Sequence, residues 1–193
     1  MMAPLAPHTA EEIWSRIGNK GFVVQNKWPE EKEMEKDPRA ESAEGLIRHV
    51  LEDTSEILKA TSITPKRIAY YTAADWKWQV YLKALKAADE KMRQGDFIKE
   101  VMGDPLLRSL GKSAADYAGK AIQQANQMPD EMRKSRIQDG VPAETTIFAE
   151  AADFYQREFK CAINVWKEGD QGIIDPKGRA RMAEPYRPAI YLE

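Results

Sequence analysis

The chain has very little of the residue types that build disulfides, metal sites and membrane spans. Its 193 residues include one cysteine and two histidines, so an internal disulfide is excluded and a reducing cytosol is the compartment that fits. No apolar run approaches the roughly 18 residues that a membrane-spanning helix needs. The N-terminus lacks the charged and apolar regions of a secretory signal. We therefore expect a cytoplasmic protein with no membrane partner.

Motifs for catalysis and nucleotide binding are also lacking. The sequence has neither a Gly-x-Gly-x-x-Gly run nor a Gly-x-x-x-x-Gly-Lys-Ser/Thr loop, either of which would cradle phosphates. His8, His49 and Cys161 lie in different segments, so they form neither a nucleophile with its base nor a set with the spacing of metal ligands. We expect no catalytic residue, no metal and no cofactor in this chain.

What the chain does have is a series of amphipathic segments. Apolar spacing of three and four residues predicts helices over 9–17, 40–61, 76–91, 96–102, 105–127 and 144–159. Alternation of residues predicts strands over 68–72, 161–167 and 187–193. Helices that interrupt the strands rather than alternate with them indicate an α+β fold with a sheet of about three strands and helices on one face. The last two strands are expected to be antiparallel through the connection 168–186.

Composition divides the chain into two domains and a linker. The first two short elements, 9–17 and 22–24, cannot bury their apolar faces alone, so residues 1–29 resemble the end of a helical bundle. Residues 30–40 are charged with almost no apolar content and are predicted to be a linker. Residues 41–193 are predicted to form the second domain.

Charge is unevenly distributed along the chain, although the net charge is only −2. Residues 30–60 hold ten acidic and five basic side chains, whereas residues 61–136 hold nine acidic and fourteen basic ones. The Gly/Pro-rich loop that follows the 161–167 strand carries further arginines beside Tyr186. Guanidinium groups pair with phosphates and stack on unpaired bases, so this loop is a candidate RNA-binding segment. The alternative, which the residues leave equally open, is a mobile solvated loop.

Two sets of motifs resemble known tRNA ligases. "MMAPLAPHTAEEIWSRIG", followed by "GFVVQNKWPE", resembles the last motif of the helical anticodon-binding domain of class I aminoacyl-tRNA synthetases. "ITPKRIAYYTAADWKWQVY", "DPLLRSLGKSAADYAGKAIQQ" and "RPAIYLE" resemble the C-terminal domain of the archaeal and eukaryotic type of leucyl-tRNA synthetase. The resemblance covers nearly the whole chain. It implies that residues 1–29 are a remnant of the anticodon-binding domain and that residues 41–193 are a C-terminal tRNA-binding domain.

The resemblance also implies a parent enzyme that activates leucine with ATP and magnesium and transfers it to tRNA(Leu). The ATP-binding signatures and the editing domain of that family are absent from this sequence, so the chain alone is expected to be inactive. Its expected partners are the long variable arm of tRNA(Leu) and the remaining domains of the same synthetase. The RNA-binding residues expected on this basis are Lys177, Arg179, Arg181 and Arg187 for phosphates, the terminal strand Ile190, Tyr191, Leu192 and Glu193 for the arm tip, and, as secondary candidates, Lys66, Arg67, Lys112 and Lys120.

Three alternatives remain open from the sequence. The chain could be the C-terminal region of a valine or isoleucine enzyme, although those regions tend to be coiled coils or zinc-bearing. It could be a free-standing protein-interaction domain whose basic loop meets an acidic partner. A small metabolic enzyme is disfavoured by the lack of catalytic groups.

Overall fold

The chain divides into two compact units, residues 1–38 and 39–193. The computed structural model describes residues 3–28 and 38–193. The predicted linker, 30–40, lies outside the described residues except at 38–40, where helix α2 (Pro38–Thr61) begins.

The N-terminal unit consists of a short helix, α1 (Pro7–Arg16), and a 3-10 turn, η1 (Val23–Gln25). α1 begins two residues before the predicted start, because proline suits the first helical turn, where its missing N–H removes no intrahelical bond. The Glu11 carboxylate accepts hydrogen bonds from the N–H groups of Val23 (3.0 Å) and Val24 (3.5 Å). Glu11 therefore holds the 3-10 turn against α1.

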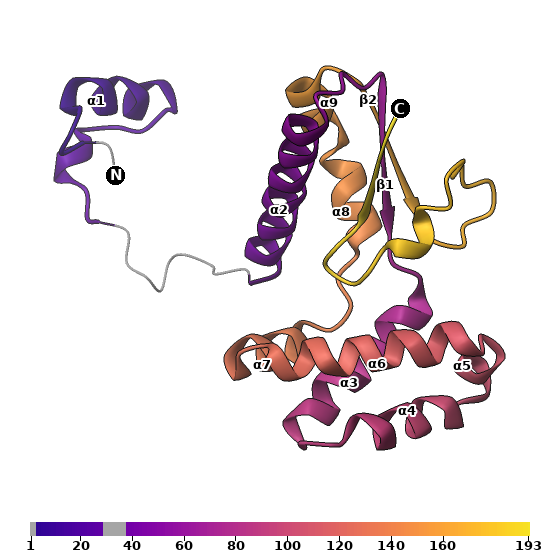
Figure 1. Cartoon of the computed structure of the whole chain (residues 1–193). Helices are drawn as coiled ribbons and strands as arrows, with labels where there is room; N and C mark the ends of the chain where they lie inside the picture. The colour runs from indigo at the N-terminus through magenta and orange to yellow at the C-terminus, as the bar shows by residue number, and fades with distance from the viewer. Residues whose placement is uncertain (1–2, 29–37) are drawn as a thin grey trace. The chain divides into compact units, whose positions relative to one another are not determined.

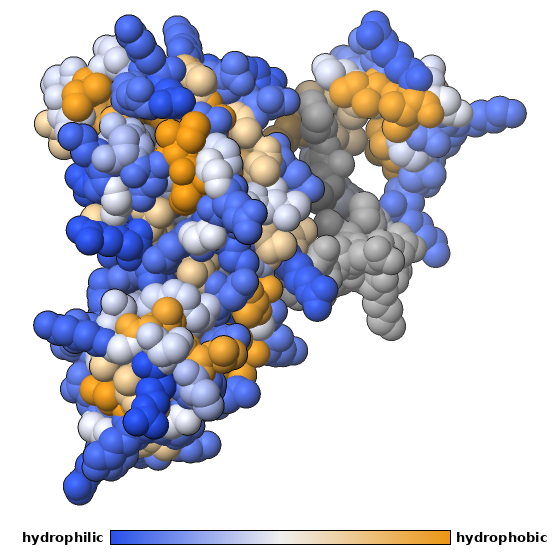
Figure 2. Space-filling view, turned by 90° about the vertical axis from the view of Figure 1, so that its right-hand side faces the viewer, coloured by the Kyte–Doolittle hydropathy of each residue, from blue (hydrophilic) through white to orange (hydrophobic). Residues whose placement is uncertain are grey.

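Much of the apolar surface of this unit is exposed. Ile17, Phe22 and Val24 are 66%, 60% and 76% exposed, and Figure 2 shows hydrophobic residues gathered on the unit. Trp14, Val24 and Trp28 are among the residues that line a hollow of about 530 Å³. The indole N–H of Trp14 is buried and has no hydrogen-bond partner among the described residues. The unit alone therefore buries only part of its hydrophobic side chains.

The C-terminal unit is built on a three-stranded sheet in the order β2-β1-β3 (Figure 1). The central strand, β1 (Arg67–Thr72), pairs in parallel with β2 (Ala162–Lys167) and antiparallel with β3 (Ala189–Leu192). The predicted α+β class and the three strands are confirmed. The predicted antiparallel direction of the last two strands is confirmed, although they do not pair with each other because β1 lies between them. β1 takes the centre because its residues are buried on both faces.

One face of the sheet is covered by helices. The elements that form this layer are α2, α8 (Glu144–Glu150) and α9 (Ala152–Phe159), and Figure 1 shows them on the same side of the strands. Ile68 and Tyr70 of β1 point into this layer, where the Tyr70 and Tyr155 rings lie 5.3 Å apart. The Tyr70 hydroxyl lies 3.0 Å from the Thr54 hydroxyl, which itself donates to the Val50 carbonyl. The layer thus combines an apolar core with satisfied buried hydroxyls.

A second hydrophobic cluster lies beyond the C-terminal end of β1 and is formed mainly by helices (Figure 1). Alanines on α6 let the helices approach closely, and Ala118, Ala121, Ile122 and Ala125 are all buried. The cluster is formed by α3 (Asp75–Asp89), α4 (Gln94–Gly103), α5 (Pro105–Ser109), α6 (Lys112–Gln127) and α7 (Asp130–Asp139).

α7 was not predicted from the sequence because its residues are mostly polar and show no apolar period. Arg133 explains how the helix is held. Its guanidinium is buried and donates to the carbonyls of Ala125 (3.1 Å) and Met128 (2.9 Å) at the end of α6, and it pairs with Asp89 of α3 (2.7 Å). Arg133 therefore satisfies helix-end carbonyls that would otherwise lack donors.

Candidate nucleic-acid interface

The segment between β2 and β3 folds back over the second face of the sheet. Its short 3-10 turn, η3 (Ala180–Met182), places Ala180 and Ala183 against Ala69 and Tyr71 of β1. The Asp175 carboxylate accepts from the N–H groups of Arg179 (2.7 Å) and Ala180 (2.8 Å). The loop that carries the predicted arginines is therefore packed on the sheet through both apolar and polar contacts.

A buried lysine fastens this loop to the helical cluster. Lys77 of α3 is 4% exposed, and its ammonium donates to the carbonyls of Arg181 and Ala183 at 2.7 Å each. It also lies 2.8 Å from the Glu168 carboxylate. Three acceptors offset the cost of burying the charge. The side chain of Arg181, whose carbonyl is held in this way, remains exposed.

The turn that follows the loop is held by a second buried polar group. Glu144 of α8 is 3% exposed, and one of its carboxylate oxygens accepts from the Tyr186 N–H at 2.6 Å. The other oxygen has no hydrogen-bond partner among the described residues. Burial raises the pKa of Glu144 to about 7. The bond holds Tyr186 in a left-handed backbone conformation (φ 62°) that a non-glycine residue rarely adopts.

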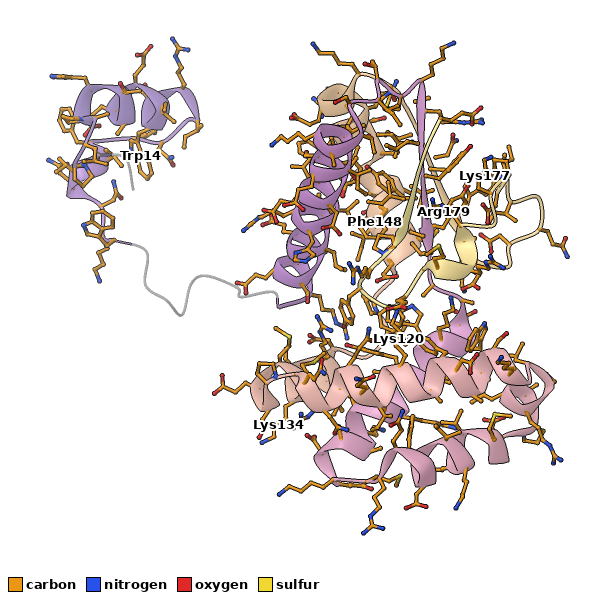
Figure 3. All side chains as sticks on the ribbon, in the orientation of Figure 1. Trp14, Lys120, Lys134, Phe148, Lys177 and Arg179 are labelled. Atoms are coloured by element: carbon orange, nitrogen blue, oxygen red, sulfur yellow. The ribbon has the colours of Figure 1, made fainter. Side chains whose placement is uncertain are left out.

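Three predicted cations from distant segments meet at one groove. Lys120 of α6, Arg179 of the loop and Arg187 after the turn line a groove of about 480 Å³, together with Ile190 of β3. Figure 3 shows Lys120 on α6 at the junction with the sheet, and Arg179 on the loop. Acidic side chains, among them Asp53 and Glu184, also line this groove, and Glu184 forms an ion pair with Lys120. The groove therefore presents two cations without an ion pair among the described residues, Arg179 and Arg187, and one paired cation.

The other predicted basic residues lie elsewhere. Lys66 and Arg67 lie at the opposite end of β1, where Glu193 pairs with Arg67 through its side chain and through both backbone groups. Lys112 is exposed at the start of α6, and Lys177 is exposed on the loop (Figure 3). The basic residues predicted from the sequence to bind RNA are therefore divided among several surfaces.

The terminal strand offers its backbone rather than its side chains. Ile190 and Leu192 pack toward the helix layer, and Tyr191 packs toward the loop cluster. β3 has β1 on one side only, so it is an edge of the sheet. Because Glu193 exchanges both backbone hydrogen bonds with Arg67, alternation along an antiparallel pair directs the N–H and C=O groups of Leu192 and Ile190 away from β1.

A cluster of side chains that could hold a metal ion is not assembled in the described part of the chain. Within residues 3–28 and 38–193, no three His, Cys, Asp or Glu side chains come together as a possible metal site. Cys161 is buried, and burial raises the pKa of its thiol. None of the helices in the described part of the chain has the length and apolar content to cross a membrane.

Three residues of this region had no distinctive sequence signal. Glu144, Arg136 and Asp53 lie on helices whose local sequence is ordinary, and they meet the loop only through the fold. Tyr186 was noted only as an aromatic neighbour of the arginines. In the structure it packs against both hydrophobic clusters.

Comparison with known proteins agrees with the resemblance. A family model described as "Anticodon-binding domain of tRNA ligase" matches residues 1–70. Leucine–tRNA ligases of Methanococcoides burtonii, Methanothrix thermoacetophila and Pyrococcus horikoshii are 35%, 34% and 34% identical to the chain over its whole length. The chain spans 20%, 20% and 18% of those enzymes, respectively. Along its whole length, the chain is a homologue of the C-terminal part of archaeal leucine–tRNA ligases.

Proposed function

We propose that this chain is the tRNA-recognition part of a leucine–tRNA ligase and that it contacts the long variable arm of tRNA(Leu). The observation that carries the proposal is the groove where Lys120, Arg179 and Arg187 converge beside an edge strand. In the complete enzyme, a separate catalytic domain uses ATP and magnesium to attach leucine to the tRNA in the cytoplasm. The chain itself contributes binding and no chemistry.

The arrangement of the groove supports a particular mode of contact. Arg179 and Arg187 present planar guanidinium groups for phosphates of the arm. Lys120 joins them by exchanging Glu184 for a phosphate. The free backbone groups of Ile190 and Leu192 meet unpaired bases at the arm tip, where main-chain donors and acceptors can read base edges.

The N-terminal unit has a different partner in this proposal. Its exposed apolar residues and the hollow beside Trp14 pack against other helices of the anticodon-binding domain in the complete enzyme. The identity with the ligases across the whole chain, and the family match over residues 1–70, support this assignment.

Binding to two transcripts tests the proposal. We expect the chain to prefer tRNA(Leu) to a tRNA with a short variable loop. A plot of log affinity against log salt should have a slope of about −2 to −3, as three phosphate contacts predict. Equal affinity for the two tRNAs would remove the variable-arm assignment. Absence of RNA binding, with capture of an acidic peptide instead, would favour a protein-interaction domain.

A further inference from the structure

A second hollow adjoins the groove and is not used by the contacts proposed above. It measures about 410 Å³ and lies between α2, α6, α7 and the turn at Tyr186. Asp53, Glu184 and Arg187 line both hollows, so the two lie side by side. A ligand bound through phosphates in the groove could therefore place a neighbouring group in this hollow.

A stacked guanidinium forms one wall of the hollow. The Arg136 guanidinium carbon lies 4.2 Å from the centroid of the Tyr186 ring. One of its nitrogens donates to the Tyr81 hydroxyl at 2.5 Å. The two contacts hold the guanidinium in place beside the turn before any ligand binds. The Arg136 side chain is half-buried and lines the hollow, so part of it is open to a ligand there.

The charge of Arg136 is not compensated by a direct partner. No carboxylate of the described residues lies within ion-pair distance of it. Burial raises the pKa of Tyr81, so the phenol that binds Arg136 stays neutral near pH 7. An arginine that has no carboxylate partner among the described residues and is held by two aromatic side chains is suited to stack on an aromatic base.

The remaining walls supply hydrogen-bonding groups and an apolar contact. His49 and Asp53 come from α2, Gln124 from α6, and Met128 from the end of α6. The Gln124 amide donates to Glu184 at 3.3 Å, which leaves its carbonyl oxygen as an acceptor. Donors and acceptors around a planar stacking surface are what a single nucleobase requires for binding outside a helix.

We propose that this hollow binds one unpaired base of the RNA, stacked on Arg136, while the flanking phosphates lie on Lys120 and Arg187 in the adjoining groove. The proposal rests on RNA binding by the groove and adds a base site to it. Tyr186 acts as a positioning residue, because it holds the guanidinium on which the base stacks.

The test uses the 193-residue chain and variable-arm hairpin RNAs that carry 2-aminopurine at one unpaired position at a time. Fluorescence of 2-aminopurine falls when the base stacks. We expect one position to lose at least half of its fluorescence on binding. Arg136→Lys keeps the charge but removes the planar group, so it should abolish this quenching and weaken binding by about fivefold or more.

Two further variants make the result specific. Lys134→Ala removes a charge from the same helix, but Lys134 is exposed and points away from the junction (Figure 3), so it should keep the quenching and change affinity less than twofold. His49→Trp fills the hollow from the exposed side of α2 and should abolish quenching even if Arg136→Lys alters the fold. Thermal melting shows whether each variant is folded.

The outcomes separate the two proposals. If the chain binds the hairpin with a salt-dependent affinity but Arg136→Lys and His49→Trp leave the quenching unchanged, the base site is wrong and the groove stands. Binding without quenching at any position would likewise overturn the base site and leave the groove. If the chain does not bind the hairpin at all, both proposals fail.

Discussion

The two faces of strand β1 are buried in different ways. Toward the helix layer, Ile68 and Tyr70 meet regular helices whose apolar residues recur along α2, α8 and α9. Toward the other side, Ala69 and Tyr71 meet an irregular loop. Polar contacts fasten that loop, including the Tyr71 hydroxyl, which donates to the Ile174 carbonyl at 2.7 Å. Apolar area stabilises the first face, whereas a few directed bonds define the second, which carries the arginines.

The largest expected effect is on the helix face. Phe148 of α8, labelled in Figure 3, is fully buried at 0% exposure. Phe148→Ala therefore leaves a cavity in the layer and should lower the free energy of unfolding by about 4 kcal/mol. Urea denaturation measures the change. A loss below about 1 kcal/mol would show that the helix layer closes around the missing ring and that apolar packing does not distinguish this face of β1 from the loop face.

The loop face should respond more strongly in binding than in stability. Lys77→Met removes the donor to Arg181 and Ala183 and leaves the Glu168 carboxylate without its cation, at a cost of roughly 3 kcal/mol. Because the loop is then free of α3, the variant should also lose most of its affinity for tRNA(Leu). Urea titration measures the free energy of unfolding, and filter binding on the same preparation measures the affinity for tRNA(Leu). An unchanged affinity would mean that Lys77 does not position the arginines.

The burial of the Glu144 carboxyl predicts a pH dependence of stability. Its folded pKa of about 7 lies above the ordinary value of 4.5, so the folded state holds a proton that the unfolded state has released. The free energy of unfolding should therefore fall as pH rises from about 4.5 to 7, by up to roughly 3 kcal/mol. Glu144→Gln should flatten this part of the profile. The two proteins are compared by the slope of the unfolding free energy against pH, because the amide changes that free energy by an amount independent of pH. Equal slopes in the unchanged chain and in Glu144→Gln would contradict the assignment of this pH dependence to Glu144.

The smallest effect separates two neighbouring arginines. Arg179 lines the groove and Arg181 does not, although the sequence placed them together. Arg179→Ala should weaken binding of tRNA(Leu) about fivefold and reduce the salt slope by about one. Arg181→Ala should change the affinity and the salt slope less than Arg179→Ala does. Neither variant should change the free energy of unfolding by more than about 0.5 kcal/mol. Equal effects would indicate contact with the whole loop rather than with the groove.

Sequence periodicity predicted the elements that bury one continuous face. The strand at 68–72 and the helix at 76–91 are close to the observed β1 and α3. The predicted helix at 105–127 divides at Gly111, whose φ of 57° ends α5 before α6 begins. The helix predicted at 144–159 divides at Ala151 into α8 and α9. Breaks of this kind leave the apolar spacing nearly intact, so the pattern does not reveal them.

The site was less predictable because long-range contacts assemble it. The loop arginines were visible as charges on a Gly/Pro-rich segment, but the partner of Lys120 is Glu184, 64 residues away. Arg136 lies on α7, a helix that had no apolar period and was not predicted. The resemblance to the synthetases indicated a candidate region and a candidate class of ligand. It did not indicate which cations share a groove.

β1 and its parallel neighbour β2 are far apart in the sequence, and this affects the order in which the structure forms. Residues 73–161 lie between these two strands and contain the whole helical cluster. Contacts within α3, α4 and α6 span short stretches of chain, whereas the sheet must wait for a large loop to close, which is entropically slow. A chain emerging from the ribosome would thus hold a formed helical cluster while β1 still had two unpaired edges.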